Sequence, residues 1–200
     1  MPLGDSITLG YGSNELDGYR RDLYRAITGA GTQVDFVGSQ QDGPADFDRD
    51  HEGYPGWQAA GGEGGGIAAN VYNWLKTNPA DFVLLHIGTN DISNSNQSAD
   101  KVASILDEID RYSRDTVVVL ALIVNRNDDK QAATSQFNLE VKAMALDRIS
   151  RGDKIVIVDM EHALIYPDDI KDWTHPNDTG YSKMAQVWLN ALTPLLPKCQ

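Results

Sequence analysis

Residues 116–124 read Thr-Val-Val-Val-Leu-Ala-Leu-Ile-Val, the strongest apolar run in the chain. A strand with apolar side chains on both faces is typical of a parallel sheet that is covered on both sides. Shorter runs of the same kind occur at residues 82–87 and 154–160, and residues 34–38 are interpreted as a further strand that stops at Gly38. The sequence therefore predicts a set of buried parallel strands.

Amphipathic stretches separate these runs. Four of them place apolar residues on one face of a helix. Residues 67–76 form a shorter helical candidate after the glycine-rich stretch 61–66. The four stripes are Tyr19, Leu23 and Ile27; Val102, Ile105, Leu106 and Ile109; Phe137, Val141, Met144, Ala145 and Ile149; and Tyr181, Met184, Ala185, Trp188, Leu189 and Leu192. Strands that alternate with helices predict an α/β fold with helices on both faces of a parallel sheet.

The chain has 200 residues, no abrupt change in composition and a formal net charge of -12. This length suits one domain with a sizeable core, so we expect a single domain over residues 1–200. An acidic surface repels phosphate backbones and anionic lipids, which argues against nucleic acid or a membrane as a partner. The only cysteine is Cys199, which excludes an intramolecular disulfide.

Ligands of parallel α/β sheets bind beyond the carboxyl ends of the strands, which directs attention to four short elements. The first is Gly4-Asp5-Ser6 near the start of the chain. A serine between a strand and a helix can expose its hydroxyl where backbone N–H groups bind an anion. The alternative is that Ser6 simply caps the helix.

The second and third elements are Gly53-Tyr54-Pro55-Gly56-Trp57 and Gly88-Thr89-Asn90-Asp91. Glycine lets a backbone N–H approach a ligand closely, although proline and glycine also make ordinary turns. The Asn90 amide follows a predicted strand and is suited to donate to a developing oxyanion. The alternative for Asn90 or Asp91 is a helix cap.

The fourth element is Asp172-Trp173-Thr174-His175. A carboxylate three residues before a histidine can fold back within one turn and accept a hydrogen bond from one ring nitrogen. The other ring nitrogen is then left free as a base, which is the arrangement that deprotonates a serine. The alternative is a surface histidine in a turn.

Taken together, these blocks resemble the SGNH, or GDSL-type, hydrolase superfamily. That superfamily is named for a serine, a glycine, an asparagine and a histidine in four separated blocks. The sequence supplies them in order as Ser6, a glycine within residues 53–56, Asn90 and His175, with Asp172 at the matching spacing. The resemblance implies a three-layer α/β/α sandwich with about five parallel strands and a flavodoxin-like arrangement.

The resemblance also implies roles for individual residues. Ser6 is expected to be the nucleophile, His175 the general base and then the acid, and Asp172 the residue that orients His175. The oxyanion hole is expected to comprise the N–H groups of Ser6 and Gly56 and the side-chain amide of Asn90. Gly53 is the alternative to Gly56, and the sequence leaves that choice open.

The flanking residues are most similar to carbohydrate esterase family 3, whose members deacetylate plant polysaccharides, chiefly xylan. The similar stretches are residues 1–8 (Met-Pro-Leu-Gly-Asp-Ser-Ile-Thr) and 51–57 (His-Glu-Gly-Tyr-Pro-Gly-Trp). The subgroup implies a secreted acetyl esterase that acts on acetylated xylan or oligosaccharides, without a cofactor and as a monomer. Only three residues precede Gly4, so we expect that Met1 is not the natural start and that a leader was removed.

Two aromatic residues beside the predicted site are candidates for contact with sugar rings. Trp57 follows the glycine block, and Trp173 lies inside the Asp-x-x-His block. Aromatic faces at the edge of a site can stack on a ligand, whereas the alternative is that both residues pack in the core.

Asp46, Asp48 and Asp50 alternate along the chain and invite comparison with a calcium loop. Position six of that pattern is His51 rather than glycine, and position twelve is Trp57 rather than glutamate. We therefore interpret this stretch as a solvated acidic loop and expect no metal, although the sequence leaves calcium binding by residues 42–52 open.

Two other functions compete with the acetyl esterase. One is a different SGNH activity, such as a thioesterase or an esterase that acts on other short acyl esters. The other belongs to a different class, a noncatalytic carbohydrate-binding module on an inactivated hydrolase fold. Every predicted catalytic position holds a chemically competent residue, which favours the enzyme.

Overall fold

A six-stranded sheet forms the centre of the protein, in a computed structural model that describes residues 1–196. Its order is β2-β3-β1-β4-β5-β6, and every neighbouring pair is parallel except β2 and β3. The strands are β1 (Pro2–Gly4), β2 (Gln40–Gln41), β3 (Asp50–Gly53), β4 (Phe82–His86), β5 (Val117–Leu122) and β6 (Ile155–Asp159). The predicted α/β fold with helices on both faces of a parallel sheet is confirmed, but the sheet has six strands rather than about five, and β2 is antiparallel to β3. Cys199 lies outside the described residues.

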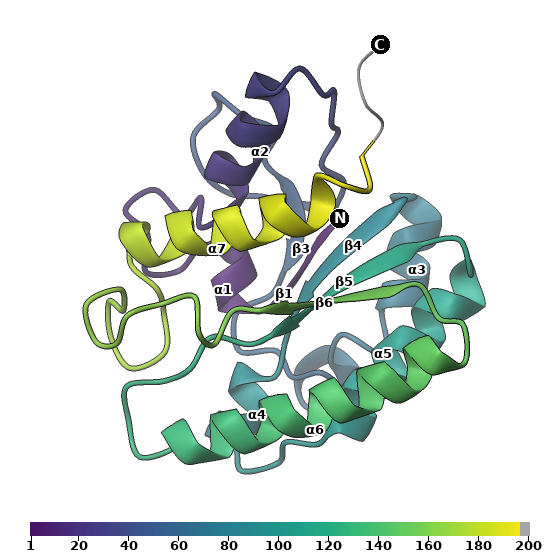
Figure 1. Ribbon diagram of the computed structural model, residues 1–200, viewed down its shortest axis with the longest axis vertical. Helices are drawn as coiled ribbons and strands as arrows, with labels where there is room; N and C mark the ends of the chain where they lie inside the picture. The colour runs from purple at the N-terminus through teal and green to yellow at the C-terminus, as the bar shows by residue number, and fades with distance from the viewer. Residues whose placement is uncertain (197–200) are drawn as a thin grey trace.

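Helices cover both faces of this sheet, as Figure 1 shows. On one face α3, α5 and α6 share a core with the sheet, and on the other α1, α2 and α7 do so. The helices are α1 (Ser6–Leu9), α2 (Arg20–Gly29), α3 (Val71–Thr77), α4 (Thr89–Ser93), α5 (Ala99–Tyr112), α6 (Gln131–Ser150) and α7 (Asp178–Leu192), with a 3-10 turn at Glu63–Gly65. All four predicted stripes lie on helices, except that Tyr19 is the N-cap of α2. In α6, however, Ile149 is exposed, so its stripe is only partly buried.

The sequence interpretation was wrong for residues 34–38, which do not form a strand. There the Phe36 N–H donates to the Asp48 carboxylate (2.6 Å) instead of to a neighbouring strand. On the side away from β4, the neighbour of β1 is β3, whose sequence Asp-His-Glu-Gly lacks an apolar run. Glu52 of β3 is buried because its carboxylate accepts hydrogen bonds from Ser39 and Tyr54, so side-chain pairing replaces apolar burial.

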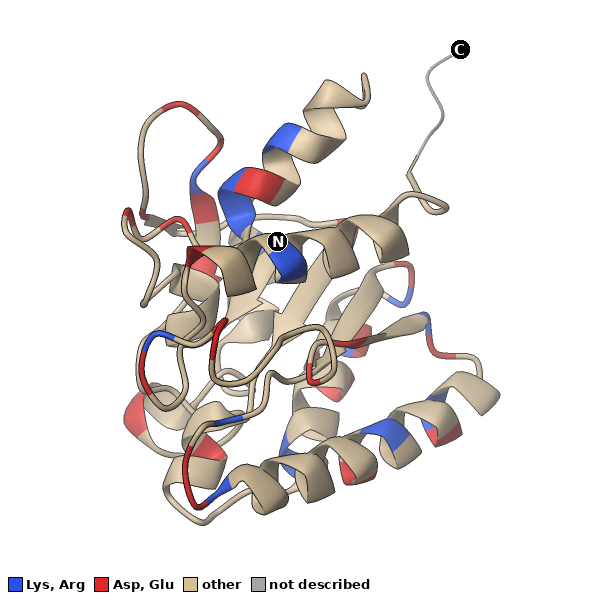
Figure 2. Ribbon diagram, turned by 60° about the vertical axis from the view of Figure 1, so that its left-hand side comes forward, with Lys and Arg blue, Asp and Glu red and all other residues tan. Residues whose placement is uncertain are grey.

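Most charged residues lie on helices and loops, and the central strands carry few of them (Figure 2). Acidic and basic residues are interspersed along α6, and Arg151, directly after its end, pairs with Asp147. Among residues 1–196, no helix combines the length and apolar character needed to cross a membrane.

The buried Arg20 guanidinium joins the segment after β1 to two loops. Burial lowers the pKa of Arg20 to about 10, so the group keeps its charge at neutral pH. It donates hydrogen bonds to backbone carbonyls from three parts of the chain. The acceptors are the carbonyl oxygens of Thr8, Leu9, Leu16, Asp42 and Arg49, at 2.8–3.0 Å. One side chain therefore fixes the C-terminal end of α1 against the loops that surround it.

Replacing Arg20 by methionine should lower the free energy of unfolding by about 3 kcal/mol or more, because buried carbonyls lose their donors. Equilibrium unfolding in urea would measure the change. Arg25→Met is the matched control, since Arg25 is exposed and pairs only with Asp46 at the surface. Arg25→Met should lower the free energy of unfolding by less than about 1 kcal/mol. Equal costs for the two variants would contradict the structural role of Arg20.

Candidate active site

Ser6 begins the one-turn helix α1 directly beyond the carboxyl end of β1. Asp5 caps this helix, because its Oδ1 accepts a hydrogen bond from the Ile7 N–H at 2.9 Å. The alternative that Ser6 itself is the cap is therefore wrong. Gly4 must be glycine, since a Cβ there would meet the His86 carbonyl oxygen at 2.1 Å. This close contact between β1 and β4 determines where Ser6 emerges from the sheet.

The structure brings Ser6, His175 and Asp172 into one chain of hydrogen bonds. The Ser6 Oγ lies 2.9 Å from His175 Nε2. On the far side of the ring, His175 Nδ1 lies 2.9 Å from Asp172 Oδ2 and 3.2 Å from Oδ1. An imidazole whose Nδ1–H donates to a carboxylate leaves Nε2 as an acceptor for the serine proton.

Backbone groups hold the Asp172 carboxylate ready for this contact. Its Oδ1 accepts hydrogen bonds from the N–H groups of Thr174 (2.8 Å) and His175 (2.9 Å). Partial burial opposes ionisation of the carboxyl, but these donors and the His175 ring outweigh it and lower the pKa of Asp172. The carboxylate is therefore charged at neutral pH and fixed in orientation.

A second Asp-x-x-His pair shows that the spacing alone does not define a site. Asp159 and His162 make the same contact, with 2.9 Å between Nδ1 and Oδ2. His162 is largely exposed, and its Nε2 makes no hydrogen bond within residues 1–196. Only the pair at 172–175 faces a serine.

The two candidate glycines of the second block differ in what their N–H groups do. The Gly53 N–H donates to His51 Nδ1 at 2.9 Å. Burial lowers the pKa of His51 to about 3, so this ring stays neutral and its Nδ1 is an acceptor. The Gly56 N–H has no hydrogen-bond partner in the described part of the chain, and Gly56 lies in a turn with φ of 81°. Gly56 is therefore the glycine with a donor available to a ligand.

Asn90 lies in α4, whose N-cap is Gly88, so neither Asn90 nor Asp91 caps this helix. One amide hydrogen of Asn90 is donated to the Trp57 carbonyl oxygen at 2.9 Å, which orients the side chain and leaves the second hydrogen available. The buried Asp91 instead accepts from the Ala59 N–H at 2.9 Å. This contact ties α4 to the loop that carries Gly56.

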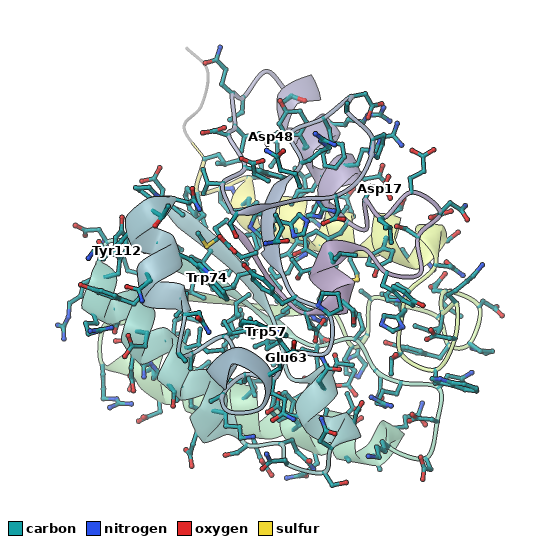
Figure 3. All side chains as sticks on the ribbon, turned by 180° about the vertical axis from the view of Figure 1, so that it is seen from behind. Asp17, Asp48, Trp57, Glu63, Trp74 and Tyr112 are labelled. Atoms are coloured by element: carbon teal, nitrogen blue, oxygen red, sulfur yellow. The ribbon has the colours of Figure 1, made fainter. Side chains whose placement is uncertain are left out.

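The two tryptophans predicted to contact substrate differ in their surroundings. Trp57 is partly buried and stacks with Tyr54 at 4.5 Å between ring centroids, and Trp74 lies 5.8 Å away. Figure 3 shows Trp57 and Trp74 as neighbours. Trp173 is 67% exposed beside His175. The core alternative therefore describes Trp57 better than Trp173.

Sequence reasoning missed Tyr11, whose ring centroid lies 4.7 Å from that of His175. The only sequence signal is an aromatic residue between Gly10 and Gly12, shortly after Ser6. Nothing in that pattern points to a histidine more than 160 residues later in the chain.

The acidic loop pairs its carboxylates with different partners. Asp46 contacts Arg21 and Arg25, and Asp48 accepts the Phe36 N–H. Asp50 accepts from the Gln41 side chain. Across residues 1–196, no group of three metal-ligating side chains converges.

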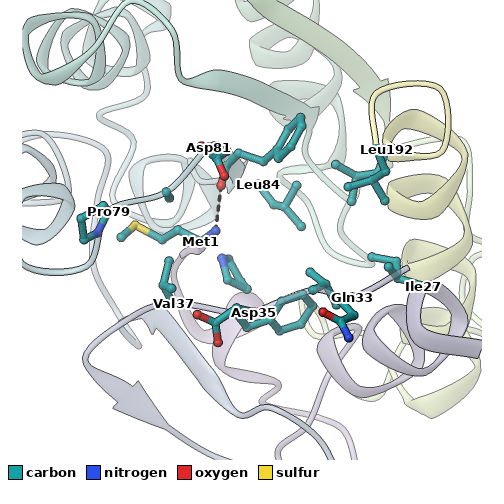
Figure 4. Close-up of a pocket in the computed structure, with 15 residues that line it drawn as sticks. Met1, Ile27, Gln33, Asp35, Val37, Pro79, Asp81, Leu84 and Leu192 are labelled. Carbon is teal, nitrogen blue, oxygen red and sulfur yellow. Dashed lines mark hydrogen bonds between the residues drawn. The ribbon is translucent and has the colours of Figure 1, made fainter. Parts of the chain in front are cut away.

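A cavity of about 290 Å³ is lined by residues that include Met1, Asp35 and Leu192 (Figure 4). Its lining includes Pro2 and Phe82, which begin β1 and β4, whereas Ser6 follows the carboxyl end of β1, so the cavity lies at the opposite end of the sheet. The Met1 amino group donates to the Phe82 carbonyl oxygen at 2.7 Å there. This cavity is therefore separate from the hydrogen-bonded serine.

A helix-covered, mainly parallel sheet with a hydrogen-bonded serine, histidine and aspartate at its carboxyl edge is the arrangement of a serine hydrolase. Residues 3–183 match the model of the GDSL-like Lipase/Acylhydrolase family. The chain therefore belongs to this family of esterases and acylhydrolases.

Solved structures similar to this chain include family 3 carbohydrate esterases. The Clostridium thermocellum family 3 carbohydrate esterase is 33% identical with a TM-score of 0.87, over 98% of this chain and 94% of that chain. A family 3 carbohydrate esterase from Talaromyces cellulolyticus is 28% identical with a TM-score of 0.81, over 98% of this chain and 96% of that chain. The predicted resemblance to this subgroup is confirmed.

A multidomain esterase from Ruminococcus flavefaciens is 30% identical over 96% of this chain. This chain spans only 28% of the length of that relative.

The buried Asp5 carboxyl beside Ser6 is in an unfavourable environment for a charge. Burial raises its pKa to about 7 from the usual 3.8, and the nearby Asp91 adds to the effect. Between these two values the folded protein keeps a proton that the unfolded chain has released. Raising the pH through this window therefore destabilises the fold.

Asp5→Asn removes this titration and keeps an oxygen acceptor for the Ile7 N–H. The variant should gain stability relative to the unsubstituted protein as the pH rises from about 4 to about 7, and the difference should then level off. Urea unfolding across this pH range would measure it. A stability difference for Asp5→Asn that narrows with rising pH would refute the prediction.

Proposed function

We propose that this protein is a serine esterase that removes acetyl groups from carbohydrate esters such as acetylated xylan. The observation that carries the proposal is the hydrogen-bond chain from Ser6 through His175 to Asp172. It lies at the edge of the sheet where parallel α/β proteins bind ligands. Membership in a family of esterases and acylhydrolases agrees with ester chemistry.

In the proposed reaction, Ser6 Oγ attacks the acyl carbonyl carbon while His175 Nε2 accepts the serine proton. The carbonyl oxygen becomes an oxyanion and is stabilised by the N–H groups of Ser6 and Gly56 and by the Asn90 amide. As the C–O bond to the alcohol breaks, His175 returns its proton to the leaving oxygen. The acyl-enzyme that remains is hydrolysed by water, which His175 activates in the same way.

The choice of carbohydrate acetates rests on the relatives named above and on the exposed Trp173 beside the histidine. Exposed aromatic faces are suited to contact with the apolar faces of sugar rings. We further propose that the protein acts on acetylated polysaccharides or oligosaccharides, outside the cell and as a monomer. The test is to compare kcat/KM on acetylated xylan with that on short acyl thioesters. Faster turnover of the thioesters would reject the carbohydrate assignment.

Ser6→Ala and His175→Ala should each lower kcat on an acetate ester by about 10⁴-fold or more, and the double variant should lose little beyond either single one. Base and nucleophile act as a unit, so their losses are not additive. His162→Ala is the matched control, because it removes a histidine with the same Asp-x-x-His contact, and it should leave kcat unchanged. If the fold-loss of kcat in the double variant equalled the product of the two single losses, that result would count against the proposed mechanism.

Asn90→Ala should lower kcat by about 10²–10³-fold, because it removes a preorganised donor to the oxyanion. KM should change far less, since that donor acts chiefly in the transition state. Steady-state kinetics on the same ester would separate the two effects, with Asn73→Ala on the exposed face of α3 as the control. A loss confined to KM would show that Asn90 binds the ground state instead.

A further inference from the structure

Tyr11 presents an aromatic face next to His175 without being part of the core. Its ring is tilted by 59° to the imidazole at 4.7 Å, and the residue is 53% exposed. Among residues 1–196 its side-chain hydroxyl makes no hydrogen bond, whereas its backbone carbonyl accepts one from Tyr181. A large, half-exposed ring with an unpaired hydroxyl is available to a ligand.

The position of Tyr11 is fixed by contacts on both sides of its backbone. Its N–H donates to the Ser6 carbonyl oxygen at 2.9 Å. Its own carbonyl accepts from the buried Tyr181 hydroxyl at 2.7 Å. The neighbouring Gly12 packs so closely that a Cβ there would meet the Pro176 carbonyl oxygen at 2.5 Å. The exposure of the ring is therefore built into the fold and does not arise from a loose loop.

The proposed reaction places a particular part of the substrate beside this ring. His175 Nε2 must lie within hydrogen-bonding reach of the leaving oxygen when it returns the proton. The alcohol portion of the ester therefore occupies the space next to the imidazole, where Tyr11 lies. In the same reaction the carbonyl oxygen of the acyl portion is bound by the proposed oxyanion donors.

We infer that Tyr11 is a specificity-determining residue that binds the sugar ring of the leaving alcohol. The phenol face contacts the C–H face of a pyranose, and the phenol hydroxyl hydrogen-bonds to a sugar hydroxyl. This inference rests on the proposed function and narrows the proposed substrates to esters whose alcohol portion is a sugar ring. The Trp57 ring, by contrast, is engaged with Tyr54.

The experiment compares Tyr11→Leu with the unsubstituted protein on an acetylated xylo-oligosaccharide and on ethyl acetate. Leucine keeps an apolar contact with His175 but removes the flat face. Loss of kcat/KM should be about ten-fold greater on the sugar ester than on ethyl acetate, mainly through KM. Tyr11→Phe keeps the face and should lose only about two- to three-fold. Leu139→Ala, an exposed position on α6, should leave both rates unchanged.

Three measurements distinguish a Tyr11 that binds the sugar from a Tyr11 that positions His175. The pH profile of kcat/KM should be the same for Tyr11→Leu as for the unsubstituted protein. An equal loss on both esters with a displaced pH profile would mean that Tyr11 positions His175, and the inference would be overturned. Calorimetric binding of the oligosaccharide to Ser6→Ala should weaken when Tyr11→Leu is added, and unchanged binding would also overturn it.

The same data separate this inference from the proposed function. If the unsubstituted protein hydrolyses both esters and Tyr11→Leu loses equally on both, only the role of Tyr11 is rejected. If it hydrolyses ethyl acetate but neither cleaves nor binds the oligosaccharide, the carbohydrate substrate is rejected together with the inference. Inactivity on every ester would reject the esterase itself.

Discussion

The buried guanidinium of Arg20 is the interaction on which the geometry near Ser6 depends. A helix of four residues is unstable by itself, because nucleation costs more than one turn of hydrogen bonds returns. Asp5 caps the start of α1 by accepting a hydrogen bond from the Ile7 N–H. At the other end of the helix, the Arg20 guanidinium donates hydrogen bonds to the carbonyl oxygens of Thr8 and Leu9. A cation beside these terminal carbonyls is also favoured by the helix dipole. Both ends of the helix that carries the serine are thus held from outside it.

The same arrangement explains how residues far apart in sequence meet at the serine. The close contact of Gly4 with β4 aligns the ends of two strands, so the segments that carry Ser6 and Asn90 leave the sheet together. Tyr11 then links α1 to the last segment, because it lies against His175 and is hydrogen-bonded to Tyr181 of α7. The parallel sheet provides the common edge, and a few backbone contacts set the distances across it.

How far the sequence predicts this structure depends on which interactions bury each segment. Apolar runs identified β4, β5 and β6, because burial on both faces leaves a direct trace in composition. The sequence of β3 contains no apolar run, because the buried Glu52 in this strand is stabilised by hydrogen bonds from Ser39 and Tyr54 that form only in the folded protein. Spacing indicated the Asp172–His175 contact, because a turn of four residues is local. The partner of the Gly53 N–H and the neighbour of Tyr11 are set by tertiary contacts, so no local pattern revealed them.

The Gly56 N–H has no hydrogen-bond partner among residues 1–196, and contacts of neighbouring residues offset the stability that this costs. An N–H without a partner, such as that of Gly56, lowers stability unless a ligand or water satisfies it. Several other N–H groups of this loop are paired: that of Gly53 donates to His51, that of Trp57 to the Tyr54 carbonyl oxygen, and that of Ala59 to Asp91. Local pairing therefore holds the loop rigid while Gly56 stays free. A donor that is held rigidly needs no reorganisation when an oxyanion forms. The Gly56 N–H is therefore best able to stabilise an oxyanion when the hydrogen bonds of the neighbouring residues keep its loop in place.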